Sequence, residues 1–415
     1  MTHDISYTKT AELFRLPPEL LEVQELVRKV VDAECIPLET EFLAGTRLPD
    51  SNDLVDAGGY EYDGKLTAAN WARLTQVSAE LGIDKIDVPV KYGGLGYGIL
   101  GRFVVEEQLN RSLVRLPKPD VPGILYGCTP YQEERYLWPT IRGEKKYAYA
   151  QTEPGAGSDP GNSMTTRAVR DGGAWLVTGS KTFITGASFA DYFLLLVVTD
   201  PERRQHGGMT LFLVDSNSPG ISMTPIDVWL TRQPRQFTVY FDQVRIPNEN
   251  VVGDVGSGFS LGQVWLTIQD RLVRGSLACG ILSRSLDMCT AWSKERYTFG
   301  APLSERQAIQ WMLVDVFVDL KCIRAISYEC AARADAGEDV RVLASLAKLL
   351  GGNWGHRSVD KVMQILGGLG ESMDCPVPHW YMQLRHGRIG GGTDEIQRII
   401  IARALLAQGR QVWEN

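Results

Sequence analysis

The sequence of 415 residues lacks the features that mark several protein classes. Its five histidines do not cluster at metal-ligand spacing, so we expect no metal site. The net charge of -7 leaves no basic excess for phosphates and argues against nucleic-acid binding. No apolar run reaches the roughly 18–20 residues that a membrane span needs. The first residues lack the apolar core of a signal peptide, so we expect no leader.

Paired cysteines are also lacking, since the seven cysteines are an odd number and form no CxxC motif. They are scattered as single residues, which predicts buried free thiols in a reducing compartment, here taken as the cytoplasm. The positions are Cys35, Cys128, Cys279, Cys289, Cys322, Cys330 and Cys375.

The pattern along the chain changes twice. Residues 19–145 read mostly as helices, and the first of these is expected over 20–39 with its end at Pro37. Short segments rich in β-branched and aromatic residues follow from 147 to 246, divided by turns, which predicts antiparallel strands and no βαβ unit. Long helices are then expected over 260–295, 304–335, 340–369 and 393–408. The prediction is an α+β fold with an α-helical domain at 1–146, a β-domain at 147–250 and an α-helical bundle at 251–415.

One glycine-rich stretch stands out from the others. The stretch 256–262 is expected to be a loop and the start of a helix, because it does not lie inside a βαβ unit as a dinucleotide-binding motif would. The stretch 91–98 is expected to be a tight loop between helices and not a phosphate cradle. The stretch "YAYAQTEPGAGSDPGN" (147–162) combines hydroxyl groups, small residues and an acidic residue. It could line a flat ligand with polar edges, or it could be a glycine-rich turn. Farther along, Phe183 and Thr185 are expected to share one face of a strand.

Six motifs in order resemble the acyl-CoA dehydrogenases: "YAYAQTEPGAGSD", "TGSKTFITGA", "VRIPNENVVGDVGSGF", "RYTFGAPLSERQAIQ", "QILGGLGE" and "GGTDEIQRIIIARALL". The resemblance covers residues from about 20 to 408. It implies a helical N-terminal domain, a central antiparallel β-barrel-like domain and a C-terminal four-helix bundle. It also implies FAD, an acyl-CoA substrate, an electron-transferring flavoprotein as electron acceptor, and a homotetramer built as a dimer of dimers.

The family's functional positions transfer residue by residue. By resemblance, one set lies along the flavin ring or in the adjoining loop: Tyr149, Gln151, Thr152, Ser158, Phe183 and Thr185. A second set contacts the partner subunit's FAD or adjoins that strip: Arg296, Thr298, Phe299, Gln307, Gln364, Gly367 and Gly368. Thr393 and Glu395 match further FAD contacts, and the expected substrate contacts are Ser158, Arg271, Gly391 and Gly392.

The run "RIGGGTDEIQR" (388–398) departs from the family's usual pattern. Most members have Glu-Gly-Thr there, and that Glu removes the α-proton of the acyl thioester. Its place here is taken by Gly391, which cannot act as a base. In a subgroup the base lies on the first long helix of the C-terminal domain, before an Arg. By resemblance, that residue is Asp270, preceding Arg271.

Helical spacing leaves three interpretations of Asp270 open. Its neighbours Leu266 and Val273 would desolvate the carboxylate and raise its pKa, as suits a base. Arg274 lies one turn away, so Asp270 could instead form an ordinary ion pair, or it could do both. Glu395 is a further rival for the base. We also expect that a Glu introduced at position 391 could restore a lost base.

The resemblance implies oxidation of an acyl-CoA to a trans-2-enoyl-CoA. The alternatives are a relative with other flavin chemistry, such as a desulfinase or a flavin oxidase, and a catalytically silent partner subunit. The acyl group is not identified by the sequence. Arg111, Arg115 and Lys118 could meet an acidic acyl tail, or they could simply be solvated.

Overall fold

A computed structural model describes residues 16–45, 53–57, 62, 64–229 and 231–414, and these fold into two compact units. The helical unit comprises the described residues of Met1–Gly58, Gly64–Pro117 and Asp270–Asn415. The sheet unit comprises those of Gly59–Asp63 and Lys118–Gln269. The predicted α+β class is confirmed, and the contacts join the two helical segments into one unit. Among the residues described, no helix is long and apolar enough to cross a membrane.

The helical unit contains two series of elements. The N-terminal series is α2 (Pro18–Val30), α3 (Glu39–Gly45), β1 (Leu54–Asp56), β2 (Lys65–Thr67), α4 (Ala68–Leu81) and α5 (Gly98–Leu109). The C-terminal series is α10 (Leu272–Glu295), β11 (Tyr297–Thr298), β12 (Ala301–Pro302), α11 (Gln307–Asp335), α12 (Arg341–Leu366), α13 (Gly368–Glu371), α14 (Pro376–His386), α15 (Asp394–Gln408) and α16 (Gln411–Glu414).

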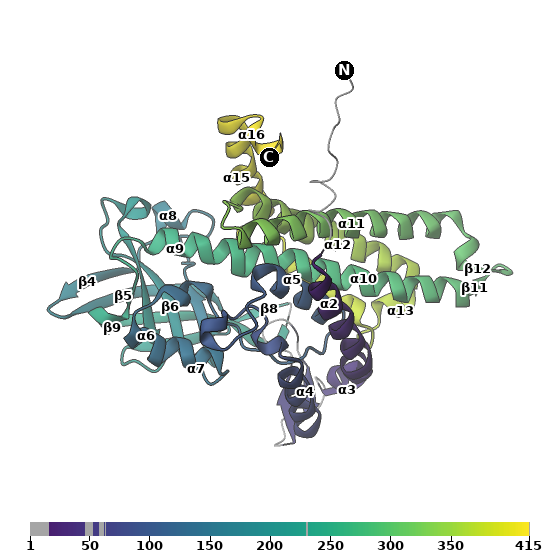
Figure 1. Ribbon diagram of the computed structural model, residues 1–415, viewed down its shortest axis with the longest axis horizontal. Helices are drawn as coiled ribbons and strands as arrows, with labels where there is room; N and C mark the ends of the chain where they lie inside the picture. The colour runs from purple at the N-terminus through teal and green to yellow at the C-terminus, as the bar shows by residue number, and fades with distance from the viewer. Residues whose placement is uncertain (1–15, 46–52, 58–61, 63, 230, 415) are drawn as a thin grey trace. The chain divides into compact units, whose positions relative to one another are not determined.

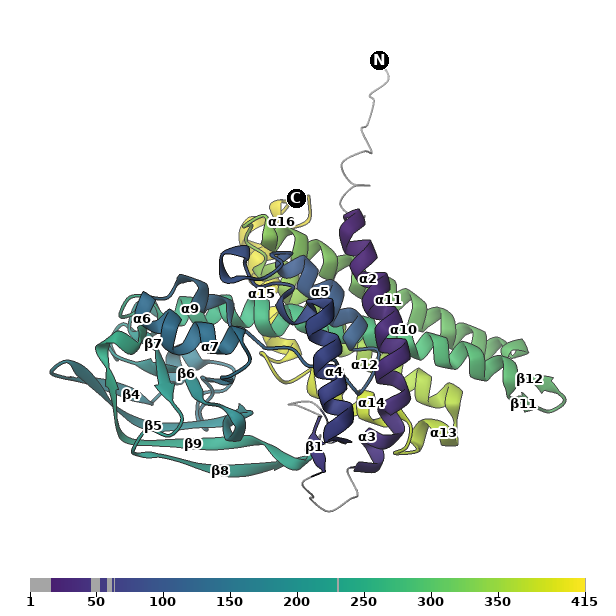
Figure 2. The same cartoon turned by 60° about the horizontal axis from the view of Figure 1, so that its bottom comes forward.

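The long helices α10, α11 and α12 lie side by side and pack against one another (Figures 1 and 2). α12 also packs against α14 and α15, so it connects the bundle to the C-terminal glycine run. A glycine makes one of these contacts possible, because a Cβ on Gly351 of α12 would come within 2.5 Å of the Arg274 carbonyl oxygen of α10. This close approach fixes α12 beside the first turns of α10.

The N-terminal helix does not end at Pro37 as predicted. After α2 the chain continues through a π-helical turn at Val31–Cys35 and a 3₁₀ turn at Ile36–Leu38, and then enters α3. Pro37 is tolerated because it lies in the first turn of the new helical segment, where its missing N–H has no intrahelical acceptor to lose.

The cysteines are free, as predicted, and five of the seven are buried. Burial raises the pKa of the Cys35 thiol to about 12, which makes it inert at neutral pH. Cys322 is exposed and Cys128 is half-buried, so the expectation of burial is wrong for these two.

The sheet unit is built around one sheet of eight strands. The strands are β3 (Tyr147–Ala150), β4 (Arg167–Asp171), β5 (Ala174–Thr185), β6 (Tyr192–Val198), β7 (Met209–Asp215), β8 (Ile221–Val228), β9 (Thr231–Pro247) and β10 (Val251–Val252). The order is β10-β7-β6-β4-β5-β9-β8, with β3 paired to β6. Its short helices are α6 (Pro130–Gln132), α7 (Trp138–Ile141), α8 (Pro160–Ser163) and α9 (Gly258–Trp265). Figure 2 shows β5, β9 and β8 running alongside one another.

The sheet is not purely antiparallel, which corrects the prediction from sequence. β3 and β4 both pair with β6 in parallel, whereas the other strand pairs of the sheet are antiparallel. The sequence pattern missed this because the chain from β3 to β6 passes through the short helix α8 and a hairpin, without the long crossover helix typical of parallel pairs. Every residue of β6 is buried, as expected for a strand inside a sheet covered on both faces.

The helix predicted over 260–295 is interrupted. α9 ends at Trp265, a π-helical turn covers Leu266–Arg271, and α10 begins at Leu272. Asp270 therefore lies in a π turn, a feature that is frequent at functional sites because it rotates side chains away from regular helical positions.

Candidate active site

The glycine run 390–392 forms the loop between α14 and α15. Gly391 and Gly392 have φ angles of +69° and +89°, which disfavour any residue with a side chain. The loop is braced from both ends, since Arg388 Nε donates to Asp394 Oδ2 at 3.0 Å and the Asp394 amide donates to the Arg388 carbonyl at 3.1 Å. Thr393 then caps α15 by accepting a hydrogen bond from the Ile396 amide at 3.4 Å.

The space above Gly391 is filled by the carboxylate of Asp270. A Cβ placed on Gly391 would lie 1.9 Å from Asp270 Oδ2 and 2.8 Å from its Cγ. The side chain from the first long helix thus stands where a side chain at position 391 would begin. The expectation that a Glu at position 391 could replace the base stays a prediction. A side chain there would have to displace the side chain at position 270, and it would strain the backbone at the φ of Gly391.

Asp270 is held by the arginine one turn along the helix. Arg274 Nη2 donates to Asp270 Oδ1 at 2.8 Å, and each side chain is about one-sixth exposed, at 17% for Arg274 and 16% for Asp270. The ion pair expected as one of the interpretations is thus present. Arg271, which is 5% exposed, directs its Nε toward the Gly391 carbonyl oxygen at 3.5 Å. Two residues of one helical turn therefore contact the glycine loop.

Further buried charges lie behind this pair. Lys348 of α12 is fully buried, and its Nζ lies 3.6 Å from Asp394 Oδ1. Burial lowers the pKa of Lys348 to about 8, against an opposing attraction to Asp394. Burial also lowers the pKa of His386 to about 4, with Arg274 and Lys348 adding to the effect and Asp270 opposing it. His386 is therefore neutral at physiological pH.

Glu395, the rival for the base, is fully exposed in the first turn of α15. Its carboxylate accepts hydrogen bonds from its own backbone amide and from the Thr393 side chain, and these lower its pKa. This arrangement gives Glu395 a role at the helix N-terminus, where a negative charge is favoured.

In the sheet unit, the expected flavin residue Tyr149 is engaged with residues of its own unit. Its hydroxyl donates to Gln151 Oε1 at 2.7 Å, and its ring stacks on Trp265 with centroids 4.2 Å apart at 16°. Gln151 is 8% exposed. Trp265 was not among the predicted site residues, because nothing in the spacing of a helix that lies more than a hundred residues later indicates this contact.

A buried ion pair joins the two predicted flavin motifs. Lys181 Nζ donates to Glu153 Oε1 at 2.9 Å and to the Gln151 carbonyl at 3.0 Å. The Thr182 amide donates to the Thr152 carbonyl at 2.8 Å. Burial would raise the pKa of Glu153, but Lys181 and hydrogen bonds from Thr166 and Thr165 outweigh it and lower that pKa to about 2. These bonds bring the segment 149–153 alongside the start of the strand segment 181–185.

The strand face predicted from alternation is present. Phe183 and Thr185 are both exposed, while Ile184 between them is buried. Phe183 is 57% exposed and has a φ of +53°, at a register shift between β5 and β9. Thr185 Oγ1 accepts a hydrogen bond from Gln236 Nε2 at 2.8 Å. An exposed aromatic ring beside a hydroxyl suits a flat ligand with polar edges. Ser158 is exposed in the glycine-rich loop.

The expected contacts to a partner's cofactor lie at the far ends of the bundle helices and are mostly exposed. Arg296, Thr298 and Phe299 belong to the hairpin β11–β12, where Phe299 is 99% exposed with a φ of +49°. Arg306 Nη2 fixes the hairpin by donating to the Thr298 carbonyl at 2.6 Å. The other expected contacts, all exposed, are Gln307, Gln364, Gly367 and Gly368.

No group of three or more potential metal ligands occurs in the described part of the chain, where the search was made. The site residues that sequence reasoning missed besides Trp265 are Lys348, His386 and Asp394. They come from α12, α14 and α15, and only folding brings them to the loop. The one signal in the sequence that could have indicated these residues is a charged residue on the face of a helix that is expected to be buried.

Two family models match the chain. The one described as "Acyl-CoA dehydrogenase, C-terminal domain" covers residues 256–406, and "Acyl-CoA dehydrogenase, middle domain" covers residues 148–244. Among similar proteins, (R)-benzylsuccinyl-CoA dehydrogenase of Thauera aromatica is 32% identical over 96% of this chain and 98% of its own length. Cyclohexane-1-carbonyl-CoA dehydrogenase of Geobacter metallireducens is 32% identical over 88% of this chain and 95% of its own length. The solved structure of butyryl-CoA dehydrogenase from Megasphaera elsdenii superposes with a TM-score of 0.80 at 26% identity, over 95% of this chain and 99% of that one.

Proposed function

Because the chain belongs to the acyl-CoA dehydrogenase family, we propose that it oxidises the α,β-bond of an acyl-CoA thioester to a trans-2-enoyl-CoA, with Asp270 as the base. The position of the Asp270 carboxylate above Gly391 carries the proposal. A base has to reach the α-proton of the thioester. A carboxylate standing directly above Gly391 offers that reach to a substrate bound against the loop.

Asp270 performs one proton transfer in this reaction. One of its carboxylate oxygens takes the α-proton, and the pair of electrons left on the α-carbon forms the new double bond as the β-hydrogen departs with its own pair. Arg274 donates to the other oxygen and holds the carboxylate in place. The half-buried position of Asp270 limits access of water to the developing carbanion.

The residues of the sheet unit fit FAD. The exposed Phe183 and Thr185, and the segment Tyr149–Thr152 fixed by Lys181, supply a flat apolar face, hydroxyls and backbone groups. FAD, when bound, accepts the β-hydrogen of the substrate as hydride. We assign Tyr149, Gln151, Thr152, Ser158, Phe183 and Thr185 to holding it.

The exposed hairpin supports a second subunit as part of the site. The Phe299 side chain is apolar and almost fully exposed, and its backbone is strained. The folding of a single subunit gives no reason for this combination. A partner subunit that covers Phe299, in a homotetramer built from dimers, would bring its FAD to Arg296 and Thr298. An electron-transferring flavoprotein is the proposed acceptor of the electrons.

The purified protein tests this function directly. We expect it to be yellow and to be bleached anaerobically by acyl-CoA thioesters in a panel of chain lengths, with formation of the enoyl product. A yellow protein that no thioester bleaches would favour a relative with other flavin chemistry, such as a desulfinase or an oxidase. A colourless protein that gains no flavin on addition of FAD would favour the silent partner subunit.

A further inference from the structure

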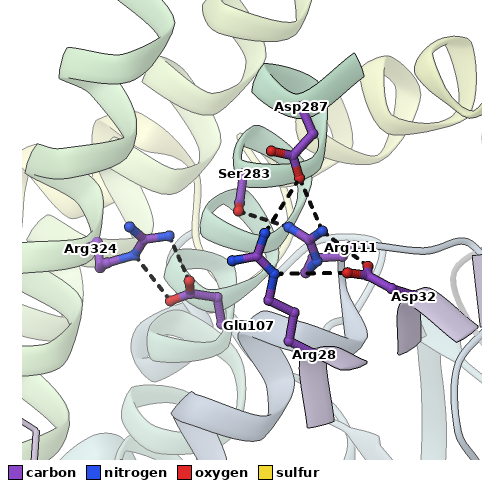
Figure 3. A network of polar contacts seen from close by, with 7 residues as sticks. All are labelled: Arg28, Asp32, Glu107, Arg111, Ser283, Asp287 and Arg324. Carbon is purple, nitrogen blue, oxygen red and sulfur yellow. Dashed lines mark hydrogen bonds and ion pairs between the residues drawn. The ribbon is translucent and has the colours of Figure 1, made fainter. Parts of the chain in front are cut away.

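The arginines first considered for an acidic acyl tail are engaged in the helical unit. Arg111 is 2% exposed, so the expectation that it is solvated is wrong. Its guanidinium donates to Asp32 and to Asp287 at 3.1 Å each, as Figure 3 shows. Arg115 is paired with Glu106. Both arginines are matched by carboxylates of their own unit, which gives no support to a site for an acidic acyl tail.

Gln151 of the sheet unit differs from these arginines, because its side-chain donor is not used inside the protein. The residue is 8% exposed. Its Oε1 accepts a hydrogen bond from the Tyr149 hydroxyl at 2.7 Å. Within the described part of the chain its Nε2 donates no hydrogen bond, and this atom is not fully buried. The amide is therefore held by its oxygen and presents its NH₂ group to a ligand beside β3.

Tyr149, which holds the amide, is itself fixed in place. Its ring stacks on Trp265 with centroids 4.2 Å apart at 16°. Its hydroxyl lies against Gly262 of α9, where an added Cβ would stand 2.3 Å from the hydroxyl oxygen. Burial raises the pKa of this hydroxyl, so Tyr149 keeps its proton and donates it to Gln151. Tyr149 thus determines which end of the amide remains available.

Trp265 is anchored in turn by two hydrogen bonds in series. Its Nε1 donates to the Tyr147 hydroxyl at 3.2 Å, and that hydroxyl donates to Asp120 Oδ2 at 3.0 Å. These bonds fix the plane of the indole on which the Tyr149 ring stacks. All of these residues belong to the sheet unit, where they form one chain of contacts from Asp120 to Gln151.

Resting on the proposed function, we propose that the Gln151 amide donates to an acceptor atom of the FAD ring system, and that Trp265 is a positioning residue that holds this amide through Tyr149. The ring system of FAD carries carbonyl oxygens and ring nitrogens that accept hydrogen bonds, and a primary amide supplies two donors. These acceptors gain electron density when the ring is reduced. A donor fixed beside them therefore favours the reduced form over the oxidised form.

The test measures FAD binding to the apoprotein and the reduction potential of the FAD-loaded protein. Gln151→Met keeps a side chain of similar length without a donor, so we expect its Kd for FAD to rise about 3- to 10-fold. Its reduction potential should become more negative. Gln151→Glu should raise the Kd further, because the carboxylate still accepts from Tyr149 but has no donor for the ring. Gln151→Glu protein that binds FAD as tightly as the wild type would overturn the proposal.

A double-variant cycle tests whether Trp265 acts through Gln151. Trp265→Leu removes the stack and should raise the Kd for FAD as much as Gln151→Met does. The double variant should lose little beyond either single variant, because both remove the same contact. Losses that multiply would show that Trp265 only supports the fold. Tyr149→Phe is a milder variant that keeps the stack and removes the hydroxyl, and an unchanged Kd in this variant would also overturn the proposal.

The matched control is Trp175→Leu. Trp175 is another tryptophan of the sheet unit, 4% exposed, and its ring meets Phe212 edge-on with centroids 5.7 Å apart. Its replacement should lower the melting temperature and leave the Kd for FAD unchanged. This control separates the loss of a buried ring from the loss of the amide's position.

The outcomes separate this proposal from the proposed function. If the variants bind FAD as tightly as the wild type and an acyl-CoA still bleaches the flavin, the amide contact fails and the dehydrogenase function stands. A raised KM for the acyl-CoA with an unchanged Kd for FAD would place the amide at the substrate and overturn the proposal. If the variants lose FAD as expected but no thioester bleaches the wild-type protein, the dehydrogenase function fails while the roles of Gln151 and Trp265 stand. Wild-type protein that binds no FAD would overturn both.

Discussion

Gly391→Ala tests whether the Asp270 carboxylate stands above the glycine loop. Two contributions to the loss of stability follow from the structure. A side chain at a φ of +69° costs about 1–2 kcal/mol. The new Cβ, 1.9 Å from Asp270 Oδ2, must also displace the carboxylate from Arg274, which removes a charge-assisted hydrogen bond of about 1–3 kcal/mol. We expect Gly391→Ala to lower the free energy of unfolding by about 2–5 kcal/mol.

Gly337→Ala is the matched control in the same unit. Gly337 has a φ of +77° and nothing within 4 Å of an added Cβ, so only backbone strain of about 1–2 kcal/mol should appear. Urea unfolding of both variants measures the difference. In a background of Asp270→Ala, the penalty of Gly391→Ala should shrink to that of Gly337→Ala, because the displaced carboxylate is gone. Equal penalties for the two glycine variants in the wild-type background would refute the placement of Asp270.

Three further predictions concern the surroundings of the site. Between pH 6.5 and about 4 the unfolded chain protonates His386 before the folded protein does, so the free energy of unfolding should fall with falling pH. His386→Asn should flatten this dependence of the free energy of unfolding on pH, as measured by urea unfolding at several pH values. An unchanged dependence would contradict the burial of the imidazole. Lys181→Met should lower the free energy of unfolding by about 3–5 kcal/mol because it leaves the buried Glu153 carboxylate without its cation, and a double variant with Glu153→Gln should recover part of the loss; a loss below 1 kcal/mol would show that the pair is dispensable. Arg296→Ala should lower FAD occupancy and weaken subunit association together, as measured by flavin absorbance and sedimentation, and a fully flavinylated monomer would exclude the shared site.

The regular elements could be predicted from local pattern. β5 and β7 lie within the span 147–246 that was predicted to contain strands, because their β-branched and aromatic residues are bounded by turn residues. The long helices α11, α12 and α15 lie where apolar spacing indicates them. The π turn at Leu266–Arg271 was missed, since no local residue pattern distinguishes it from an α-helix. α14 was also missed, because its proline-rich start resembles a loop.

The candidate site could be predicted only in part. The resemblance predicted a glycine at position 391 in place of the usual base and a carboxylate at Asp270 instead, and helical spacing predicted the ion pair of Asp270 with Arg274. Lys348 and His386 were not expected, because their role depends on how α12 and α14 pack around the loop. The burial of Arg111 was missed for the same reason, since its carboxylate partners lie on two other helices.

Single-turnover flavin reduction in Asp270→Asn tests whether Asp270 is the base. Asparagine keeps the size of the side chain and can accept a hydrogen bond from Arg274, but it cannot take up the α-proton. With an acyl-CoA that bleaches the wild-type protein, we expect a rate lower by about 10²–10⁴-fold, with FAD content and thermal stability maintained. Asp270→Asn protein that reduces its flavin as fast as the wild type would show that the base is another residue.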